Sequence, residues 1–294
     1  MSRSEFDSTA ALIGYLDLEA LEKDLFRGQS PQLGWQRTFG GQVIGQSLVA
    51  AQRTVEAERA VHSMHAYFLR PGDPATPIIF TVDRIRDGTS FSTRNVVAIQ
   101  HGKAIFSLSA SFQKEEEGLE YQAEMPEVPQ PEALAGTGNI DASFLEGAPQ
   151  VILDYWKKQR PIEVRPVFLE HYVSDKPLPP IQHAWVRTLG PVPEDRVIQA
   201  SILAYLSDML LLDTTLFAHG TNVFDRSIQA ASLDHAMWFH RPFDFSDWLL
   251  YTMDSPNTNG ARGFARGSLY SRDGALVASV AQEGLIRPRR SAAR

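Results

Sequence analysis

The sequence contains one long pattern twice, and this duplication constrains the fold more than any other feature. An Arg-Pro-x-Asp motif that begins at Arg70 recurs at Arg241, about 171 residues later. Both copies lie in matching stretches, residues 62–113 and residues 233–285, where turn glycines and large apolar residues also recur. A solenoid repeat is about 20 to 50 residues long, so this period indicates a duplicated domain. Differences between the copies should show which half carries the chemistry.

Each half is predicted to contain one helix and a set of long antiparallel strands. In the first half the helix is expected within residues 38–56 and the strands at 62–70, 77–86, 91–100 and 103–113. In the second half the helix is expected at residues 194–212 and the strands at 181–187, 232–241, 247–254, 262–271 and 275–286. Asp-Gly, His-Gly and Asn-Gly steps between alternating segments are typical of hairpin turns. The pattern therefore predicts an α+β fold in which each helix covers one face of a sheet.

The stretch between the halves has a different composition. It begins with consecutive glutamates, continues with several prolines and includes Gly136-Thr137-Gly138, a pattern typical of a linker. We therefore predict an N-terminal repeat at 1–115, a linker at 116–165 and a C-terminal repeat at 166–294, which carries the catalytic residues.

Composition excludes several classes of function. The chain has 294 residues, a net charge of −7 and a pI near 5.6, whereas a nucleic-acid-binding domain normally has a basic face. It contains no cysteine, which excludes disulfides, thiolate nucleophiles and cysteine metal sites. The N-terminus lacks a signal-peptide pattern, and no apolar run approaches the roughly 18 residues of a membrane span. A soluble cytoplasmic protein without a membrane span is expected.

Common catalytic motifs are also missing. Gly45-Gln46-Ser47 continues with Leu48-Val49, so it is not the Gly-x-Ser-x-Gly of an α/β-hydrolase. The sequence has no phosphate-binding loop, dinucleotide fingerprint or His-Glu-x-x-His motif. His235 and His240 lie five residues apart, which places them on opposite faces of a strand, so we predict no metal site there.

Features that both halves share are expected to serve the fold. Arg70 falls on Arg241, and after a one-residue shift Arg94 falls on Arg266. The shared arginines are more simply explained by a structural role than by catalysis, either fixing a strand end or pairing with a neighbouring aspartate.

Two positions differ in a way that indicates chemistry. Ser232 occupies the place of Val61, at the start of the strand that leads into Arg-Pro-x-Asp. Gln282 occupies the place of Ala110 in the last strand. Polar residues have replaced apolar ones at strand ends that a helix should cover. Taken singly, Ser232 and Gln282 would be unremarkable strand residues.

The second predicted helix adds Asp208. Its helical neighbours include Ala204, Leu211 and Leu212, so its carboxylate is expected on an apolar face. Burial there would raise the pKa of the carboxylate towards the range of a general base. The alternative is a structural aspartate that accepts a hydrogen bond from the backbone or an arginine. His62, just before the first copy of the strand, is a further candidate base for which the sequence shows no partner.

Several segments resemble the acyl-CoA thioesterase II family. They are residues 39–42, 62–73, 86–91, 233–242 and 279–284. The resemblance covers nearly the whole chain and is weakest at residues 115–165. It implies a double hotdog fold, in which two helices are each wrapped by an antiparallel sheet. It also implies assembly into a homo-oligomer, a dimer or a tetramer.

The resemblance further implies hydrolysis of fatty acyl-CoA to a free acid and coenzyme A, without a metal or other cofactor. The family's catalytic Asp, Ser or Thr, and Gln correspond here to Asp208, Ser232 and Gln282. A water held by Ser232 and Gln282 would lose a proton to Asp208 and attack the thioester carbonyl. The N–H groups of Gly40 and Gly41, at the start of the first helix, are our candidates for stabilising the oxyanion.

Three alternatives remain open at this level. Asp208 could attack the thioester directly and form an anhydride. The same fold also serves acyl-thioester dehydratases and hydratases, which need a paired His and Asp that we do not find at the expected helix start. A non-catalytic acyl-CoA-binding protein is the third, although such a protein has no need of a buried carboxylate aimed at water.

Overall fold

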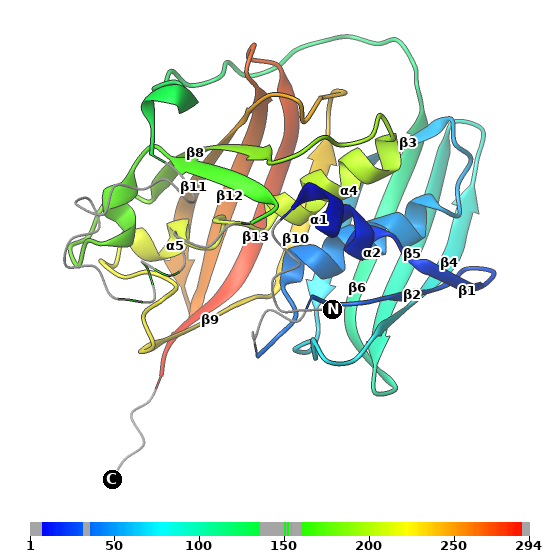
Figure 1. Ribbon diagram of the computed structural model, residues 1–294, viewed down its shortest axis with the longest axis horizontal. Coiled ribbons are helices and arrows are strands. Elements are labelled where there is room, and N and C mark those ends of the chain that lie inside the picture. Colours follow the sequence, from blue (N-terminus) through cyan, green and yellow to red (C-terminus); the bar gives the residue numbers. More distant parts are fainter. Residues whose placement is uncertain are drawn as a thin grey trace.

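The computed structural model describes residues 8–31, 36–135, 150, 152, 154 and 160–289. Within this part of the chain, one antiparallel sheet of thirteen strands curves around two central helices, α2 (Gly40–Gln52) and α4 (Arg196–Ser207), which lie side by side (Figure 1). The predicted α+β double hotdog is confirmed. None of the helices described is both long and apolar enough to cross a bilayer.

The first half forms one side of this sheet. Its elements are α1 (Thr9–Leu16), β1 (Glu19–Glu22), β2 (Leu25–Gly28), α2, β3 (Arg59–Phe68), β4 (Ile78–Asp87), β5 (Phe91–Gln100) and β6 (Lys103–Lys114). The strands pair in the order β1-β2-β4-β5-β6-β3. The predicted helix and four strands are therefore present, and α1, β1 and β2 are additions that the hydrophobic pattern did not indicate.

The second half continues the sheet. A short 3-10 helix, η1 (Pro131–Ala133), precedes β7 (Ile162–Pro166), η2 (Leu169–Tyr172), β8 (Ile181–Thr188), α4 and α5 (Thr214–Phe217). The remaining strands are β9 (Ile228–Ser232), β10 (Asp234–Phe239), β11 (Leu249–Asn259), β12 (Arg262–Ser271) and β13 (Leu276–Pro288). β10 pairs with β3 of the first half, so the sheet runs through both halves without interruption.

The register of β3 in the first half agrees with that of β9 and β10 in the second half. In the first half Val61 pairs with Phe112 and Met64 with Ala110, with an irregularity at His62. In the second half Ser232 pairs with Gly284, the chain skips Leu233, and Ala236 pairs with Ala281. The irregular residue thus falls at equivalent places. A bulge of this kind redirects the side chains beside it, which places Val61 and Ser232 in corresponding positions.

The two central helices are antiparallel and very close together. A Cβ added to Gly41 would collide with the carbonyl oxygen of Tyr205, and one added to Gly45 would come within 2.9 Å of the carbonyl oxygen of Ser201. Glycines four residues apart lie on one face of a helix. The sequence of α2 therefore provides a side-chain-free strip along which the backbone of α4 lies.

The helix predicted at 194–212 ends earlier than expected, at Ser207. Asp208 is its C-cap residue, and Leu210 has a φ of 67°, a left-handed conformation that stops an α-helix. Leu211 and Leu212 therefore do not share a helical face with Asp208. The apolar spacing continued past the point at which the backbone changes direction.

The stretch after β6 is extended and packs against the second half. Gln122 bonds to the backbone of Gly274 and Leu276, and the indole N–H of Trp185 donates to the carbonyl of Pro129 at 2.9 Å. Trp185 belongs to a separate buried cluster that this stretch helps to cover. Gly136-Thr137-Gly138 lies outside the described residues, and the exact domain boundaries stay a prediction.

Arg94 and Arg266 do not correspond in space. The register pairs Ala110 with Arg94 in the first half but Gln282 with Ala265 in the second. Arg94 is buried and Arg266 is exposed, so their side chains lie on opposite faces of the sheet. The matching of the two arginines after a one-residue shift was therefore wrong, because a shift of one residue changes the face of a strand.

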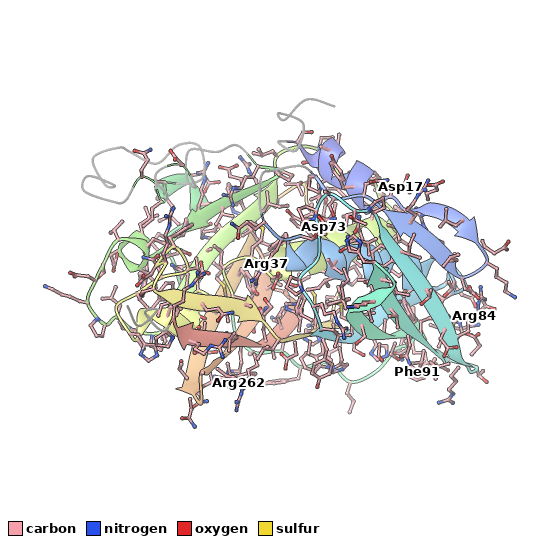
Figure 2. The ribbon with its side chains drawn as sticks, turned by 90° about the horizontal axis from the view of Figure 1, so that it is seen from below. Asp17, Arg37, Asp73, Arg84, Phe91 and Arg262 are labelled. Atoms are coloured by element: carbon pink, nitrogen blue, oxygen red, sulfur yellow. The ribbon has the colours of Figure 1, made fainter. Side chains whose placement is uncertain are left out.

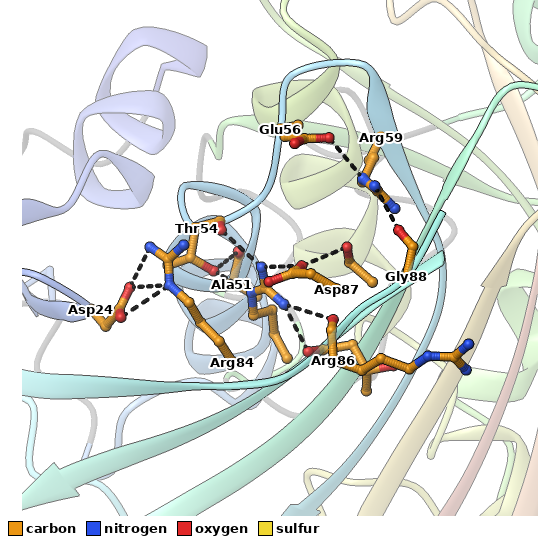
Figure 3. Close-up of polar contacts among 12 residues, drawn as sticks. Asp24, Ala51, Thr54, Glu56, Arg59, Arg84, Arg86, Asp87 and Gly88 are labelled. Atoms are coloured by element: carbon orange, nitrogen blue, oxygen red, sulfur yellow. Dashed lines mark hydrogen bonds and ion pairs between the residues drawn. The ribbon is translucent and has the colours of Figure 1, made fainter. Parts of the chain in front are cut away.

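Gln282 has its counterpart in Ala110 of the first half. Arg94 occupies the region around that counterpart. Its guanidinium donates to the hydroxyl and carbonyl oxygens of Thr54, just beyond the end of α2, at 2.8 and 3.0 Å. It also bonds to the carbonyl of Arg86 and to the carboxylate of Asp87 (Figure 3). This polar network joins the end of α2 to the turn between β4 and β5.

Candidate active site

Three polar side chains meet at the C-terminal end of α4. The amide nitrogen of Gln282 lies 2.8 Å from Oδ1 of Asp208 and 2.6 Å from Oγ of Ser232. The Ser232 hydroxyl lies 3.4 Å from the same carboxylate oxygen. The residues come from the C-cap of α4, the last position of β9 and the middle of β13. The structure thus brings together the three residues that the asymmetry of the repeat and the apolar spacing indicated.

The Asp208 carboxylate is held in a low-dielectric environment. Burial raises its pKa from 3.8 to about 6, against the opposing effect of hydrogen bonds from Gln282, the backbone N–H of Gly41 and Ser232. The structural alternative raised above, a backbone hydrogen bond to Asp208, is thus also present. A carboxylate with a pKa near 6 is ionised at neutral pH and basic enough to accept a proton from water.

Gly40 and Gly41 bring the start of α2 against this carboxylate. A Cβ on Gly40 would lie 2.6 Å from Oδ2 of Asp208 and 2.9 Å from the ring of Phe68. The glycine pair therefore does allow another group to approach the first backbone N–H donors of the helix. In this structure the approaching group is the Asp208 carboxylate, to which Gly41 donates.

His62 lies elsewhere. Its Nε2 is 2.8 Å from the Ser111 hydroxyl, and its ring contacts the ring of Phe91, which lies at the edge of the molecule in Figure 2. The active-centre end of β3 is marked by Phe68, whose N–H donates to the carbonyl of Leu233. Phe68 lies six positions beyond His62 along β3, about 20 Å at roughly 3.3 Å per residue. The structure therefore does not bring His62 to the three polar side chains.

Two further titratable groups adjoin the site, Asp213, which was not singled out from the sequence, and His235, which was considered there only as a metal ligand. Burial and the neighbouring charge of Asp208 raise the pKa of Asp213 to about 7. His235 on β10 is fully buried, and its Nε2 lies 2.8 Å from the hydroxyl of Ser207, the residue before Asp208. His235 had a detectable signal, because it replaces Met64 in the repeat. Asp213 had no such signal, because it comes after the true end of α4, which the sequence did not predict.

No group of three or more residues able to hold a metal ion occurs in the described part of the chain. The chemistry supported by the side chains that are present is proton transfer. A carboxylate with a raised pKa stands beside a hydroxyl and an amide that could both bind one water molecule.

Comparison with known proteins identifies the family. Residues 29–113 match the model of the acyl-CoA thioesterase N-terminal domain, and residues 154–285 match that of acyl-CoA thioesterase. The chain is 41% identical to acyl-CoA thioesterase 2 of Haemophilus influenzae over 276 residues, covering 94% of this chain and 96% of the relative. It is 40% identical to acyl-coenzyme A thioesterase 8 of Homo sapiens, covering 92% and 87% of the two chains.

Solved structures agree with the sequence relatives. The acyl-CoA thioesterase II TesB2 from Mycobacterium marinum superposes with a TM-score of 0.78 at 41% identity, covering 97% of this chain and all of that one. A hot dog fold protein from Alicyclobacillus acidocaldarius superposes with a TM-score of 0.76 at 19% identity, covering 95% and 98%, which supports the fold alone. Together with the matches over both halves, the 41% identity across nearly the full length shows that this chain belongs to the acyl-CoA thioesterase family.

Proposed function

We propose that the chain hydrolyses fatty acyl-CoA to a free fatty acid and coenzyme A at a single centre built from Asp208, Ser232 and Gln282. The observation that carries the proposal is the convergence of these side chains, with Gln282 within 2.8 Å of Asp208 and 2.6 Å of Ser232, in a family of thioester hydrolases. The equivalent positions in the first half hold Val61 and Ala110, which have no acid or base function.

The proposed reaction uses water as the nucleophile. The Ser232 hydroxyl and the Gln282 amide hold a water molecule beside the Asp208 carboxylate, which takes one proton as the water oxygen attacks the thioester carbonyl carbon. The carbon–sulfur bond then breaks, the electron pair leaves on the coenzyme A sulfur, and the proton on Asp208 neutralises the thiolate. Asp208 returns to its ionised form.

Backbone donors at the start of α2 are proposed to stabilise the oxyanion. N–H groups in the first turn of a helix have no partner within that helix, and the helix dipole adds partial positive charge there. The N–H of Gly41 already donates to Asp208. Gly40 is therefore the first choice of the pair as the oxyanion donor.

A thiol-release assay with acyl-CoA esters of several chain lengths tests the function. Asp208→Asn should lower kcat by at least about a hundredfold, because the amide cannot accept the proton. Asp254→Asn is the matched control, since this carboxylate is exposed and paired with Arg266. The wild-type rate should fall as the pH drops through about 6, where Asp208 gains its proton. Near-normal turnover by Asp208→Asn would contradict the proposal.

Heavy-oxygen water separates the two possible nucleophiles. In a single turnover, attack by water places the label in the fatty acid, whereas an anhydride hydrolysed at the aspartyl carbonyl places it in Asp208. We expect the label in the product acid. Mass spectrometry of both the acid and the peptide that contains Asp208 gives the answer.

The same assay tests the two competing functions. A dehydratase or hydratase would interconvert hydroxyacyl-CoA and enoyl-CoA without releasing thiol, and a binding protein would do neither. The Asp208 carboxylate is bonded directly to Gln282 and Ser232 rather than to a histidine, which favours hydrolysis over the dehydratase.

We further propose that the chain assembles as a homo-oligomer, a dimer or a tetramer. Tyr67 on β3 and Trp238 on β10 are 61% and 37% exposed on neighbouring strands at the junction of the halves. Exposed aromatic residues of this kind are enriched in interfaces. Light scattering coupled to gel filtration would give the mass of the assembly. A cytoplasmic location stays a prediction that cell fractionation would test.

A further inference from the structure

A buried histidine lies behind the three active-site side chains. His235 is fully buried on β10, and its Nε2 is 2.8 Å from the hydroxyl of Ser207. The register of β10 with β13 pairs Ala236 with Ala281, so the next pair along the two strands is His235 with Gln282. Side chains of such a pair stand on one face of the sheet about 4.5 to 5.5 Å apart at Cβ.

The facing atoms of these two side chains complement each other. Nδ1 of His235 and Oε1 of Gln282 are both buried, and neither has a well-formed hydrogen bond to any other group in the described structure. Burial lowers the pKa of His235 to about 4, while its side-chain contact with Gln282 acts in the opposite direction. A hydrogen bond from the ring to Gln282 acts in this direction because it stabilises the protonated ring.

The proton positions follow from the Asp208 carboxylate. An ionised carboxylate only accepts hydrogen bonds, so the Gln282 nitrogen must face Asp208 and its oxygen must face His235. The neutral imidazole has one ring proton, which must then be on Nδ1 for that oxygen to be satisfied. Nε2 is left as an acceptor. The Ser207 hydroxyl lies 2.8 Å from Nε2 and 2.9 Å from the carbonyl oxygen of Ala204, and in this arrangement its one proton points to Nε2.

The duplication shows that the fold does not require this histidine. At the equivalent place in the first half, Met64 pairs with Ala110 on the inner face of the sheet, and Met64 is also fully buried. An apolar pair in one half has therefore been exchanged for a polar pair in the half that carries the proposed active centre. Gln282 and His235 therefore differ together from their counterparts, Ala110 and Met64.

We propose that His235 is a positioning residue for thioester hydrolysis: its Nδ1–H holds the oxygen of Gln282, so that the amide N–H groups point at Asp208 and Ser232. The inference rests on the proposed roles of those three residues. His235 does not itself contact the reacting atoms. Without it, the Gln282 amide is free to rotate and to turn its oxygen towards the carboxylate.

Three substitutions of His235 separate positioning from packing. His235→Asn keeps an amide N–H near the place of Nδ1, His235→Gln keeps a polar group only near Nε2, and His235→Met introduces the residue of the first half. The last two should lower kcat roughly tenfold to a hundredfold, the scale at which a displacement of about 1 Å acts, with KM changed much less. His235→Asn should retain most of the wild-type kcat.

The pH profile provides a readout that packing alone would not move. The hydrogen bond from Gln282 lowers the pKa of Asp208, so its loss should shift the acid limb of the rate to higher pH. We expect this shift in His235→Gln and His235→Met but not in His235→Asn. Met64→Leu, at the equivalent buried place of the first half, is the control and should leave kcat and the pH profile unchanged.

Combination with Gln282→Ala distinguishes the inference from the function on which it rests. If His235 acts through Gln282, adding His235→Met to Gln282→Ala should cause no further loss of kcat. An additional loss in the double variant, a wild-type kcat in folded His235→Met, or equal losses in His235→Asn and His235→Gln would each overturn the inference. Normal turnover by Gln282→Ala alone would overturn the proposed role of Gln282 and this inference with it.

Discussion

At the scale of single residues, Asp208 contributes to function at a cost in stability. It ends a helix whose C-terminal dipole is negative, and its carboxylate is largely removed from water, so the ionised form is disfavoured. Three hydrogen bonds only partly offset that cost. Groups placed for reaction rather than for stability are common in active sites.

Replacement of Asp208 by Asn should therefore change stability in a pH-dependent way. The folded-state pKa, about 6, exceeds the ordinary value of 3.8, so the folded protein binds the proton more tightly than the unfolded chain. Wild-type stability is thus lost as the pH rises from about 4 to 6, by about 1 to 3 kcal/mol. The Asn variant lacks this loss.

Urea unfolding of both proteins at pH 4 and pH 7 checks this expectation. From pH 4 to pH 7, the free energy of unfolding of Asp208→Asn should rise by about 1 to 3 kcal/mol relative to that of the wild type. The substitution can also weaken the hydrogen bond from Gly41 to the Asp208 side chain. That effect is the same at both values of pH, so it cancels when the two differences in stability are compared. An unchanged difference between the two proteins would contradict the raised pKa.

At the scale of elements, the contact between α2 and α4 positions the active centre. Gly41 and Gly45 let the two backbones approach, and this approach brings the start of one helix to the end of the other. Asp208 belongs to the second half and its donor Gly41 to the first. Their meeting depends on a helix contact rather than on any sheet register.

Gly41→Ala should force these helices apart. The added Cβ would collide with the carbonyl oxygen of Tyr205, which is backbone and cannot rotate away. We expect a loss of about 1 to 3 kcal/mol in the free energy of unfolding, typical of overpacking, and a reduced kcat as Asp208 is displaced.

Gly14→Ala is the control for helix propensity. Gly14 lies inside α1, and a Cβ there meets nothing within 4 Å, so this substitution should be neutral or gain up to about 1 kcal/mol. Chemical denaturation and thiol release of both variants test the argument. Equal behaviour of the two alanine variants would show that the α2–α4 contact tolerates a side chain.

At the scale of the whole molecule, the two halves have diverged around a shared frame. The second half has Gln282 beside Ala265, whereas the first has Ala110 beside the buried Arg94. The guanidinium of Arg94 occupies the region that corresponds to the active centre and bonds there to Thr54. We therefore infer one active centre per chain.

Arg94→Met should separate stability from catalysis. The substitution leaves the buried oxygens of Thr54 without their donor, at a cost of about 1 to 3 kcal/mol in the free energy of unfolding. Because Arg94 bonds to Thr54, Arg86 and Asp87 rather than to residues of the proposed active centre, kcat at 25 °C should stay within about twofold of wild type.

Arg266→Met is the comparison, because Arg266 is an exposed arginine that forms a surface ion pair. A change of no more than about 1 kcal/mol is expected there. Unfolding curves and thiol release of both variants provide the measurement. A large loss of kcat in stable Arg94→Met would mean that the region around Arg94 takes part in the chemistry.

The sequence predicted what depends on short-range periodicity. The central helices, the long strands and the hairpin turns were correct because apolar alternation and turn residues act locally. Ser232 and Gln282 could be singled out because the repeat supplied an internal reference at Val61 and Ala110. The end of α4 was misplaced, because Leu211 and Leu212 kept the helical spacing although the backbone turns at Leu210.

The sequence by itself determined the duplication, the fold class and the half in which the polar residues gather. Only the tertiary structure decided that Asp208 meets the start of α2 at Gly41, that His62 lies far along β3 and that His235 stands behind Gln282. The physical reason is the range of the interactions. Periodicity specifies which face of an element is buried, whereas the packing of the two halves specifies which buried groups come together.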